Sequence, residues 1–241
     1  MFSNIVGVRL DLRWRKRGGW LGSHLVERVR SAPKKRQIEV VARTTNTLGA
    51  QKLADEYGEI GGVRMPDDVR VTSDCGDLYS WLVQARKPKT VVEFGSAFGV
   101  SGMYFVAGLA AAQAGHLYSF EINHEWADIA ERNIRSIGDR LTLTRGAFED
   151  HVDAVVPSEI DLAFVDGIHT YDFVMRQFDV LRPRVSSGGV IAFDDIDFKR
   201  PGARMREAWE EIAASPFAVA AVEVNGRVGL VELARSTALP V

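Results

Sequence analysis

Residues 90–103 constrain the fold most, because an apolar segment runs into a glycine-rich turn and then into a second apolar segment. The pattern predicts a buried strand over 90–94 and the start of a helix at 100–103. Gly95 and Gly99 leave no Cβ between the turn and a ligand, and the first turn of a helix presents backbone N–H groups without intrahelical partners. The segment therefore predicts a strand, a turn and a helix that bind a polar cofactor on main chain.

Predicted strands and helices alternate from residue 90 onward, which is typical of an α/β protein with a parallel sheet. The chain then ends in two strands joined by Asn225-Gly226, a dipeptide that favours a tight antiparallel hairpin. The predicted parallel strands cover 90–94, 116–121, 141–144, 160–165 and 189–193, and the hairpin strands cover 217–224 and 227–233.

The turn differs from the GxGxxG fingerprint of dinucleotide-binding proteins, because an acid precedes its first glycine and three residues separate its two glycines. It resembles the first motif of class I S-adenosylmethionine-dependent methyltransferases, especially the small-molecule O-methyltransferases. The resemblance implies a Rossmann-like, seven-stranded, mostly parallel sheet with helices on both faces and a C-terminal antiparallel hairpin. It also implies that the turn holds the methionyl part of S-adenosylmethionine, through Glu93, Gly95, Ser96, Gly99 and Ser101. The alternative is a tight connection without a ligand.

Glu121 ends the second predicted strand, 26 residues after Gly95. A carboxylate at that place can accept hydrogen bonds from both hydroxyls of a ribose. The alternative is a solvated strand end, and the joint spacing of the two motifs favours the ribose interpretation.

Two further cofactor contacts are implied by the family resemblance. The helix that begins near Ser73 resembles the one that precedes the first motif, where a polar residue reaches the cofactor, so Ser73 is a candidate contact. The alternative, a helix N-cap at Ser73 or Asp74, is favoured. Ala147 and Phe148 follow the glycine after the third strand and would border the adenine. Phe148 is equally explained as a core residue.

Carboxylates follow the fourth and fifth predicted strands, namely Asp166 after one and Asp194 and Asp195 after the other. Ligands gather at the carboxyl ends of parallel strands, so these three side chains are expected at one edge. Together they would repel, and a hard divalent cation such as Mg²⁺ relieves that repulsion. The alternative for Asp166 is a helix cap.

The sequence Asp166-Gly-x-His169-x-Tyr, followed by Asp194-Asp195, resembles metal-dependent O-methyltransferases of natural-product pathways, including macrolide-sugar methyltransferases. The resemblance covers residues 72–233. It implies that the three aspartates bind the metal, that Asp166 also borders the cofactor, and that His169 is the general base. Asp194 stands where some relatives place glutamate, which changes the reach of the ligand. Metal coordination would lower the pKa of a substrate hydroxyl, and His169 could accept its proton near neutral pH.

The N-terminal region is basic. Residues 1–40 contain ten Lys and Arg against three Asp and Glu, whereas the whole chain has a net charge of −2. We interpret residues 1–71 as a basic helical extension or lid that also makes a subunit contact in a homo-oligomer, and residues 72–241 as the methyltransferase domain. The single cysteine and the absence of an apolar segment of ~20 residues favour a cytoplasmic protein without a membrane span.

The leading hypothesis is a magnesium-assisted O-methyltransferase that acts on a hydroxyl of a small molecule such as a sugar, a diol or a phenol. A nucleic-acid methyltransferase that uses the basic N-terminus is the first alternative, and the acidic catalytic half disfavours it. A protein that binds the cofactor without transferring a methyl group is the second.

Overall fold

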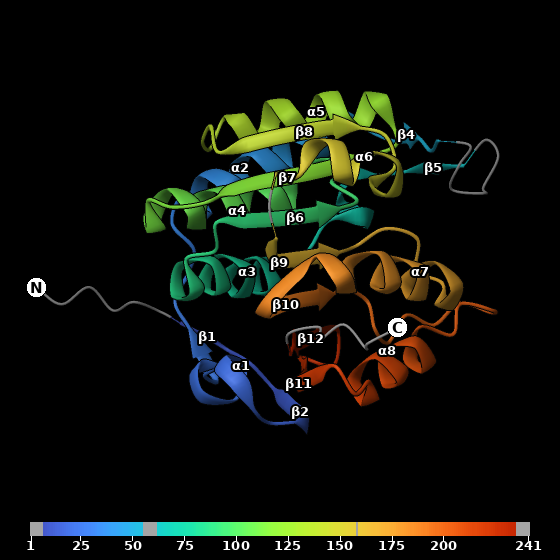
Figure 1. Cartoon of the computed structure of the whole chain (residues 1–241). Coiled ribbons are helices and arrows are strands. Elements are labelled where there is room, and N and C mark those ends of the chain that lie inside the picture. Colours follow the sequence, from blue (N-terminus) through green and yellow to red (C-terminus); the bar gives the residue numbers. More distant parts are fainter. Residues whose placement is uncertain (1–6, 55–61, 158, 235–241) are drawn as a thin grey trace, which may run out of the picture. The chain divides into compact units, whose positions relative to one another are not determined.

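The computed structural model describes residues 7–54, 62–157 and 159–234 (Figure 1). Contacts divide them into two compact units. Unit 1 comprises residues 7–8, 28–54, 62–89 and 93–156, and unit 2 comprises residues 9–27, 90–92, 157 and 159–234. Strand β6 (Thr90–Phe94) therefore contributes its first three residues to unit 2 and its last two to unit 1.

Unit 1 contains the strands and helices on either side of the glycine-rich turn. Its strand order is β6-β7-β8, and β7 and β8 are parallel. Helices α4 and α5 pack on β7, and α5 also packs on β8. Its elements are β3 (Arg28–Val29), α2 (Lys35–Asn46), β4 (Gln51–Lys52), β5 (Val63–Arg64), a 3₁₀ turn (Pro66–Val69), α3 (Ser73–Arg86), α4 (Val100–Ala112), β7 (His116–Glu121), α5 (His124–Arg135), β8 (Leu141–Arg145) and α6 (Phe148–Val155); β1 (Val8–Arg9) has one residue in each unit.

The two helices after the turn differ in how their sequences place them. In α4, residues 100–109 are all buried, which agrees with the absence of a polar stripe in its sequence. Helix α5 is amphipathic, and the Asn123 side chain caps it by accepting the backbone N–H groups of Glu125 and Trp126. Among the described residues, no helix is long and apolar enough to cross a membrane.

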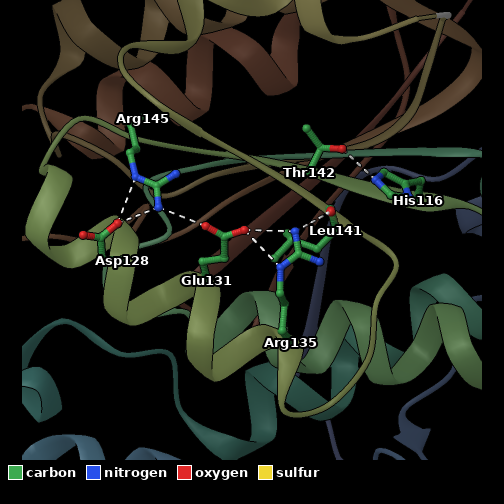
Figure 2. A network of polar contacts seen from close by, with 7 residues as sticks. All are labelled: His116, Asp128, Glu131, Arg135, Leu141, Thr142 and Arg145. Carbon is green, nitrogen blue, oxygen red and sulfur yellow. Dashed lines mark hydrogen bonds and ion pairs between the residues drawn. The ribbon is translucent and has the colours of Figure 1, made fainter.

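Figure 2 shows how charged side chains join α5 to β8 in unit 1. Arg145 of β8 contacts Asp128 at 2.5 Å and Glu131 at 2.9 Å. Arg135 contacts the other Glu131 oxygen at 2.9 Å and the Leu141 carbonyl at 3.5 Å. Because these side chains are partly exposed, each pair contributes about 0–1 kcal/mol. We therefore assign this network a local structural role.

Unit 2 has the strand order β2-β11-β12-β10-β9-β6. Strands β9 and β10 are parallel, whereas β10, β12, β11 and β2 pair with one another antiparallel in that order. Helix α7 packs on β9, and α8 packs on β2, β11 and β12. The elements are β2 (Leu12–Lys16), α1 (Gly19–His24), β9 (Ile160–Val165), α7 (Tyr171–Leu181), a 3₁₀ turn (Arg182–Arg184), β10 (Val185–Phe193), α8 (Met205–Ala214), β11 (Ala218–Val224) and β12 (Val228–Leu233).

The predicted C-terminal hairpin is confirmed. Asn225 and Gly226 both have positive φ, at 53° and 66°, as the dipeptide requires. The turn also includes Arg227, because Val224 pairs with Val228 across the hairpin. The sequence placed Arg227 at the start of the last strand, and its position in the turn matters for the acidic centre described below.

The predicted helical N-terminal extension is wrong for the short strands β1, β3, β4 and β5, and also for residues 12–16, which form the edge strand β2 next to β11. The seven predicted strands are present, and β2 is an additional one. Arg15 pairs with buried Glu223, and the Lys16 ammonium contacts the Ala214, Ser215 and Ala218 carbonyls. Half-buried and exposed residues alternate along β2, and these partners engage Arg15 and Lys16. The described part of the predicted extension is divided between both units, and residues 1–6 and 55–61 lie outside the described residues.

Replacing Glu223 by glutamine is expected to lower the free energy of unfolding by about 1–3 kcal/mol. The Glu223 side chain is 3 % exposed and accepts hydrogen bonds from Arg15, Arg206 and Trp209, all in unit 2. Burial raises the pKa of Glu223, but the hydrogen bonds outweigh burial and hold that pKa below 4.5. A carboxyl group with a lowered pKa stabilises the fold above its unfolded pKa and loses that effect as the pH falls through its folded pKa.

Urea unfolding at pH 7 and at successively lower pH should therefore show the difference between wild type and Glu223→Gln shrinking in acid. Glu210→Gln is the matched control, because Glu210 lies 3.8 Å from the same Arg15 but is 56 % exposed. An equal effect of the two substitutions at pH 7 would contradict this account of the β2 attachment.

Candidate functional site

The glycine-rich turn connects β6 to α4 in unit 1 and has the left-handed backbone that its sequence predicts. Gly95, Ala97 and Gly99 have φ values of 81°, 43° and 85°. The N–H groups of Gly95 and Ser96 donate to the Phe120 carbonyl of β7, at 3.0 and 3.3 Å, and Gly99 donates to the Ser96 carbonyl at 2.7 Å. Backbone hydrogen bonds thus fix the turn against the neighbouring strand.

Gly99 is also required for the packing of α5 against the turn. A Cβ at this position would lie 2.9 Å from the Ala130 carbonyl oxygen and 3.0 Å from the Ile134 Cγ1, both in α5. The glycine therefore permits close packing of α5 against the turn, in addition to its positive φ. The predicted contact of Gly99 with the cofactor stays a prediction.

Glu93 and Ser96 lie beneath the turn rather than on its surface. Both are almost fully buried, at 0 % and 1 % exposure. The Ser119 hydroxyl of β7 donates to Glu93 Oε2 at 2.5 Å and lies 2.5 Å from the Ser96 hydroxyl. Their predicted direct contacts with the cofactor stay predictions, and what the structure shows is a buried polar chain that supports the turn.

Glu121 ends β7 as predicted and joins two loops. Its side chain is buried, Oε2 accepts the Ala97 N–H at 2.8 Å, and Oε1 accepts the Asn123 N–H at 2.9 Å. Two backbone N–H groups therefore fix this carboxylate at the end of β7, and the ribose assignment stays a prediction.

The other predicted cofactor residues differ in their surroundings. The cap of α3 is Thr72, whose Oγ1 accepts the Cys75 N–H at 3.4 Å, so the prediction that Ser73 or Asp74 is the cap is wrong; Ser73 is the first helical residue and is half-buried. An N-cap has extended backbone, and Thr72 is the last residue with that conformation. Ser101 is a buried residue in the first turn of α4.

Phe148 is a core residue, the second of the two interpretations that the sequence left open. It is 3 % exposed, and its ring centre lies 3.7 Å from that of Phe94 and 5.2 Å from that of Phe120. Ala147 precedes it as the half-buried N-cap residue of α6. The adenine contact implied for these two residues stays a prediction.

Sequence reasoning missed the residues that hold the N-terminal region onto the turn. Leu53 packs in one apolar cluster with Phe98 of the turn and Trp126 of α5. Asn123 donates to the Lys52 carbonyl at 2.9 Å. These partners are about 45 to 75 positions apart in the chain, and no local pattern marks them. Part of the N-terminal region therefore borders the predicted cofactor turn within unit 1.

The acidic residues of unit 2 surround His169. Asp166 follows β9 and its Oδ1 lies 3.2 Å from His169 Nε2, while Asp195 Oδ2 lies 4.0 Å from His169 Nδ1. Asp194 follows β10, is 1 % exposed, and its N–H donates to the Val165 carbonyl at 3.0 Å. The prediction that the two acidic motifs meet at the carboxyl ends of adjacent strands agrees with these distances.

The electrostatics of this centre follow from burial and from the crowding of carboxylates. Burial and the charge of Asp194 raise the pKa of Asp166 to about 6, although the hydrogen bond with His169 opposes the shift. Burial also raises the pKa of Asp195, again with Asp194 adding to it. Burial lowers the pKa of His169, but Asp166 and the other aspartates outweigh burial and raise it. The imidazole is thus more basic than an isolated one.

Arg227 is the functional-site candidate that sequence reasoning missed entirely. Its Nε and Nη2 atoms contact the two oxygens of Asp194 at 3.0 and 2.8 Å, and Nε also lies 3.0 Å from Asp195 Oδ1. The residue lies 33 positions after Asp194, in a hairpin turn whose sequence signals only its backbone geometry. No sequence pattern links the two.

The residues as arranged do not fit the predicted magnesium ion. Mg²⁺ requires several oxygen ligands directed at one point. Over residues 7–54, 62–157 and 159–234, no group of three or more His, Cys, Asp and Glu side chains is placed to hold a metal ion. Arg227 instead occupies both oxygens of Asp194 and one of Asp195. The metal-ligand roles of these aspartates and of Asp166 stay predictions that this geometry does not support.

Comparison with known proteins agrees with the fold and with the glycine turn. Residues 92–196 match the family described as "Methyltransferase domain". A "Putative O-methyltransferase" of Mycobacterium marinum is 31 % identical over 126 residues, which is 50 % of this chain and 54 % of the relative. "Uncharacterized protein y4gI" of Sinorhizobium fredii is 28 % identical over 154 residues, 58 % of this chain but 16 % of that protein. The matched part of the chain thus covers about half of the length of the first relative and less than a fifth of the length of the second.

Solved structures share the fold at low sequence identity. An O-methyltransferase from Bacillus cereus, described in complex with SAH, has a TM-score of 0.63 and 19 % identity, with 88 % of this chain and 95 % of that chain covered. The O-methyltransferase TomG from Streptomyces achromogenes, described in complex with SAM, has a TM-score of 0.60 and 16 % identity, with 89 % and 94 % covered. Residues 92–196 thus match a methyltransferase family, and the α/β fold with its antiparallel C-terminal strands is shared with solved structures of O-methyltransferases.

Proposed function

We propose that this protein transfers a methyl group from S-adenosylmethionine to a hydroxyl group of a small molecule such as a sugar, a diol or a phenol. The observation that carries the acceptor part is the His169–Asp166 pair, with 3.2 Å between His169 Nε2 and Asp166 Oδ1. The cofactor part is supported by the backbone-fixed turn, by the buried carboxylate of Glu121, and by the cofactors named with the similar structures.

S-adenosylmethionine supplies an electrophilic methyl group, and the residues of the turn together with Glu121 would hold it. A hydroxyl oxygen is a poor nucleophile until its proton leaves, so the chain needs a base near the acceptor. A neutral His169 ring can take that proton. Asp166 fixes the orientation of the ring and stabilises the imidazolium that results. The raised pKa of His169 increases its strength as a proton acceptor.

Magnesium assistance has no place in this proposal, because the described carboxylates do not converge as metal ligands. The nucleic-acid alternative has less support, because two of the ten basic side chains in residues 1–40 are engaged within the protein. In the basic run of β2, Arg15 pairs with Glu223 and Lys16 with the carbonyls that end α8. These two side chains are committed to the protein itself. TomG is described as involved in tomaymycin synthesis, and natural-product hydroxyls are accordingly the first acceptors to test.

Calorimetric titration with S-adenosylmethionine and with S-adenosylhomocysteine tests the cofactor part, and both are expected to bind at one site. Mass spectrometry then follows methylation across panels of sugars, diols and phenols. Binding without any methylated product would favour the cofactor-binding alternative. Absence of heat and of a thermal shift with either compound would refute the proposal. RNA is included in the panel, and methylated RNA would favour the nucleic-acid alternative.

A further inference from the structure

The position of Arg227 gives the acidic centre of unit 2 a cation of its own. Asp194 and Asp195 together have four carboxylate oxygens, and three of them lie within 3.0 Å of an Arg227 nitrogen. The Asp194 contact is bidentate, with one guanidinium nitrogen on each oxygen. A planar guanidinium matches this geometry and remains charged at any pH at which the protein is folded.

The backbone holds both sides of this contact in place. Asp195 has a φ of 49°, an unusual conformation for a residue other than glycine, and it turns the chain directly after β10. The N–H of Ile196 donates to the Arg227 carbonyl at 2.9 Å, so the loop after β10 is bonded to the hairpin turn itself. The backbone of the hairpin turn requires a positive φ at Gly226, which is 66°. Backbone and side-chain contacts thus both join the loop after β10 to the hairpin turn.

Burial makes a cation at this place necessary. Asp194 is 1 % exposed, and an ionised carboxylate in such surroundings is costly unless it is paired. Asp195 is its neighbour in the chain and adds a second negative charge. A divalent ion bound to Asp194 would have to take oxygens that Arg227 already holds. The guanidinium and a metal ion are therefore competitors for one position.

We propose that Arg227 is a positioning residue that takes the place of a divalent cation at Asp194 and Asp195, so that the protein binds no metal there. The inference rests on the proposed function only for its effect on turnover. Its first consequence, the absence of a metal site, is measured without substrate. Its second is that removal of the guanidinium uncovers a pair of carboxylates that can bind a divalent ion.

The test titrates Mn²⁺ into chelator-treated protein and follows binding by calorimetry and by the electron paramagnetic resonance signal of free Mn²⁺. Wild type is expected to bind no Mn²⁺ at millimolar concentration. Arg227→Met keeps the length of the side chain without its charge, and we expect it to bind one Mn²⁺ at least ten-fold more tightly than wild type. Arg227→Lys retains a positive charge and should not gain a site. Lys199→Met is the matched control, because Lys199 contacts Asp197 instead and is 85 % exposed.

Stoichiometric Mn²⁺ binding by wild type would overturn the proposal, and so would a folded Arg227→Met that binds no more Mn²⁺ than Lys199→Met. If Arg227→Met does not fold, the wild-type titration together with Arg227→Lys decides the matter. Once an acceptor is known, turnover of wild type should be unchanged by a chelator, and loss of turnover that Mg²⁺ restores would also overturn it. Failure to find any acceptor would count against the proposed function and leave the Mn²⁺ result intact.

Discussion

Replacing His169 by alanine is expected to lower kcat for methyl transfer by about 10²- to 10⁴-fold. The substitution removes the imidazole that would accept the hydroxyl proton, and it leaves the turn and Glu121 of unit 1 untouched. The affinity for S-adenosylhomocysteine should therefore stay within about two-fold of wild type, because the hydroxyl that His169 would deprotonate belongs to the methyl acceptor and not to this ligand. Turnover is measured by mass spectrometry and affinity by calorimetry.

His116→Ala is the matched control, since His116 of β7 contacts Thr142 of β8 at 2.9 Å and takes no part in the acidic centre (Figure 2). Asp166→Asn should also slow turnover, because the amide cannot stabilise an imidazolium as a carboxylate does. Turnover of His169→Ala at the wild-type rate would remove the base from the mechanism. A parallel loss of cofactor affinity would show that the residue acts on binding instead.

Local signals explain why so much of the fold could be predicted from the sequence. The β6 strand, its turn and α4 are adjacent in the chain, and Gly95 and Gly99 mark the positive φ that the turn needs. Asn225 and Gly226 mark the hairpin in the same way. These features depend on a few neighbouring residues, so one sequence is enough to recognise them.

Contacts between distant segments explain most of what the sequence did not reveal. Strand β2 forms because β11 offers an edge and because the Glu223 side chain accepts a hydrogen bond from Arg15, 208 positions away. The charge run of β2 alone is equally compatible with a solvated helix face, which is why the helical interpretation failed there. The same applies to Leu53, which reaches the cluster of Phe98 and Trp126 from outside the predicted domain.

The acidic centre shows the limit most clearly. Residue types and spacing brought Asp166, His169, Asp194 and Asp195 to one place, and the distances agree. Whether a metal ion or a side chain neutralises them depends on a fifth residue in the hairpin turn. The charges in the sequence predict that a cation is needed at this place, but they do not predict whether it is a metal ion or a side chain.

Replacing Glu121 by alanine should weaken S-adenosylhomocysteine binding roughly 30- to 1,000-fold, which corresponds to about 2–4 kcal/mol. The substitution removes the buried acceptor of the Ala97 and Asn123 N–H groups, and with it the predicted acceptor of the ribose hydroxyls. Loss of the acceptor for the two N–H groups should lower the free energy of unfolding by about 1–3 kcal/mol, which thermal unfolding without ligand measures.

A double-mutant cycle isolates the contribution of the predicted contact between Glu121 and the ribose hydroxyls. Glu121→Gln keeps the side-chain shape and one acceptor oxygen, but its NH2 group cannot accept the second backbone N–H, so it should be less stable than wild type and more stable than Glu121→Ala. An S-adenosylhomocysteine analogue without one ribose hydroxyl should bind wild type more weakly than the parent compound does, and this difference should shrink in Glu121→Gln. If the analogue loses equal affinity for both proteins, Glu121 does not bind the ribose, and its role is confined to holding the turn through Ala97.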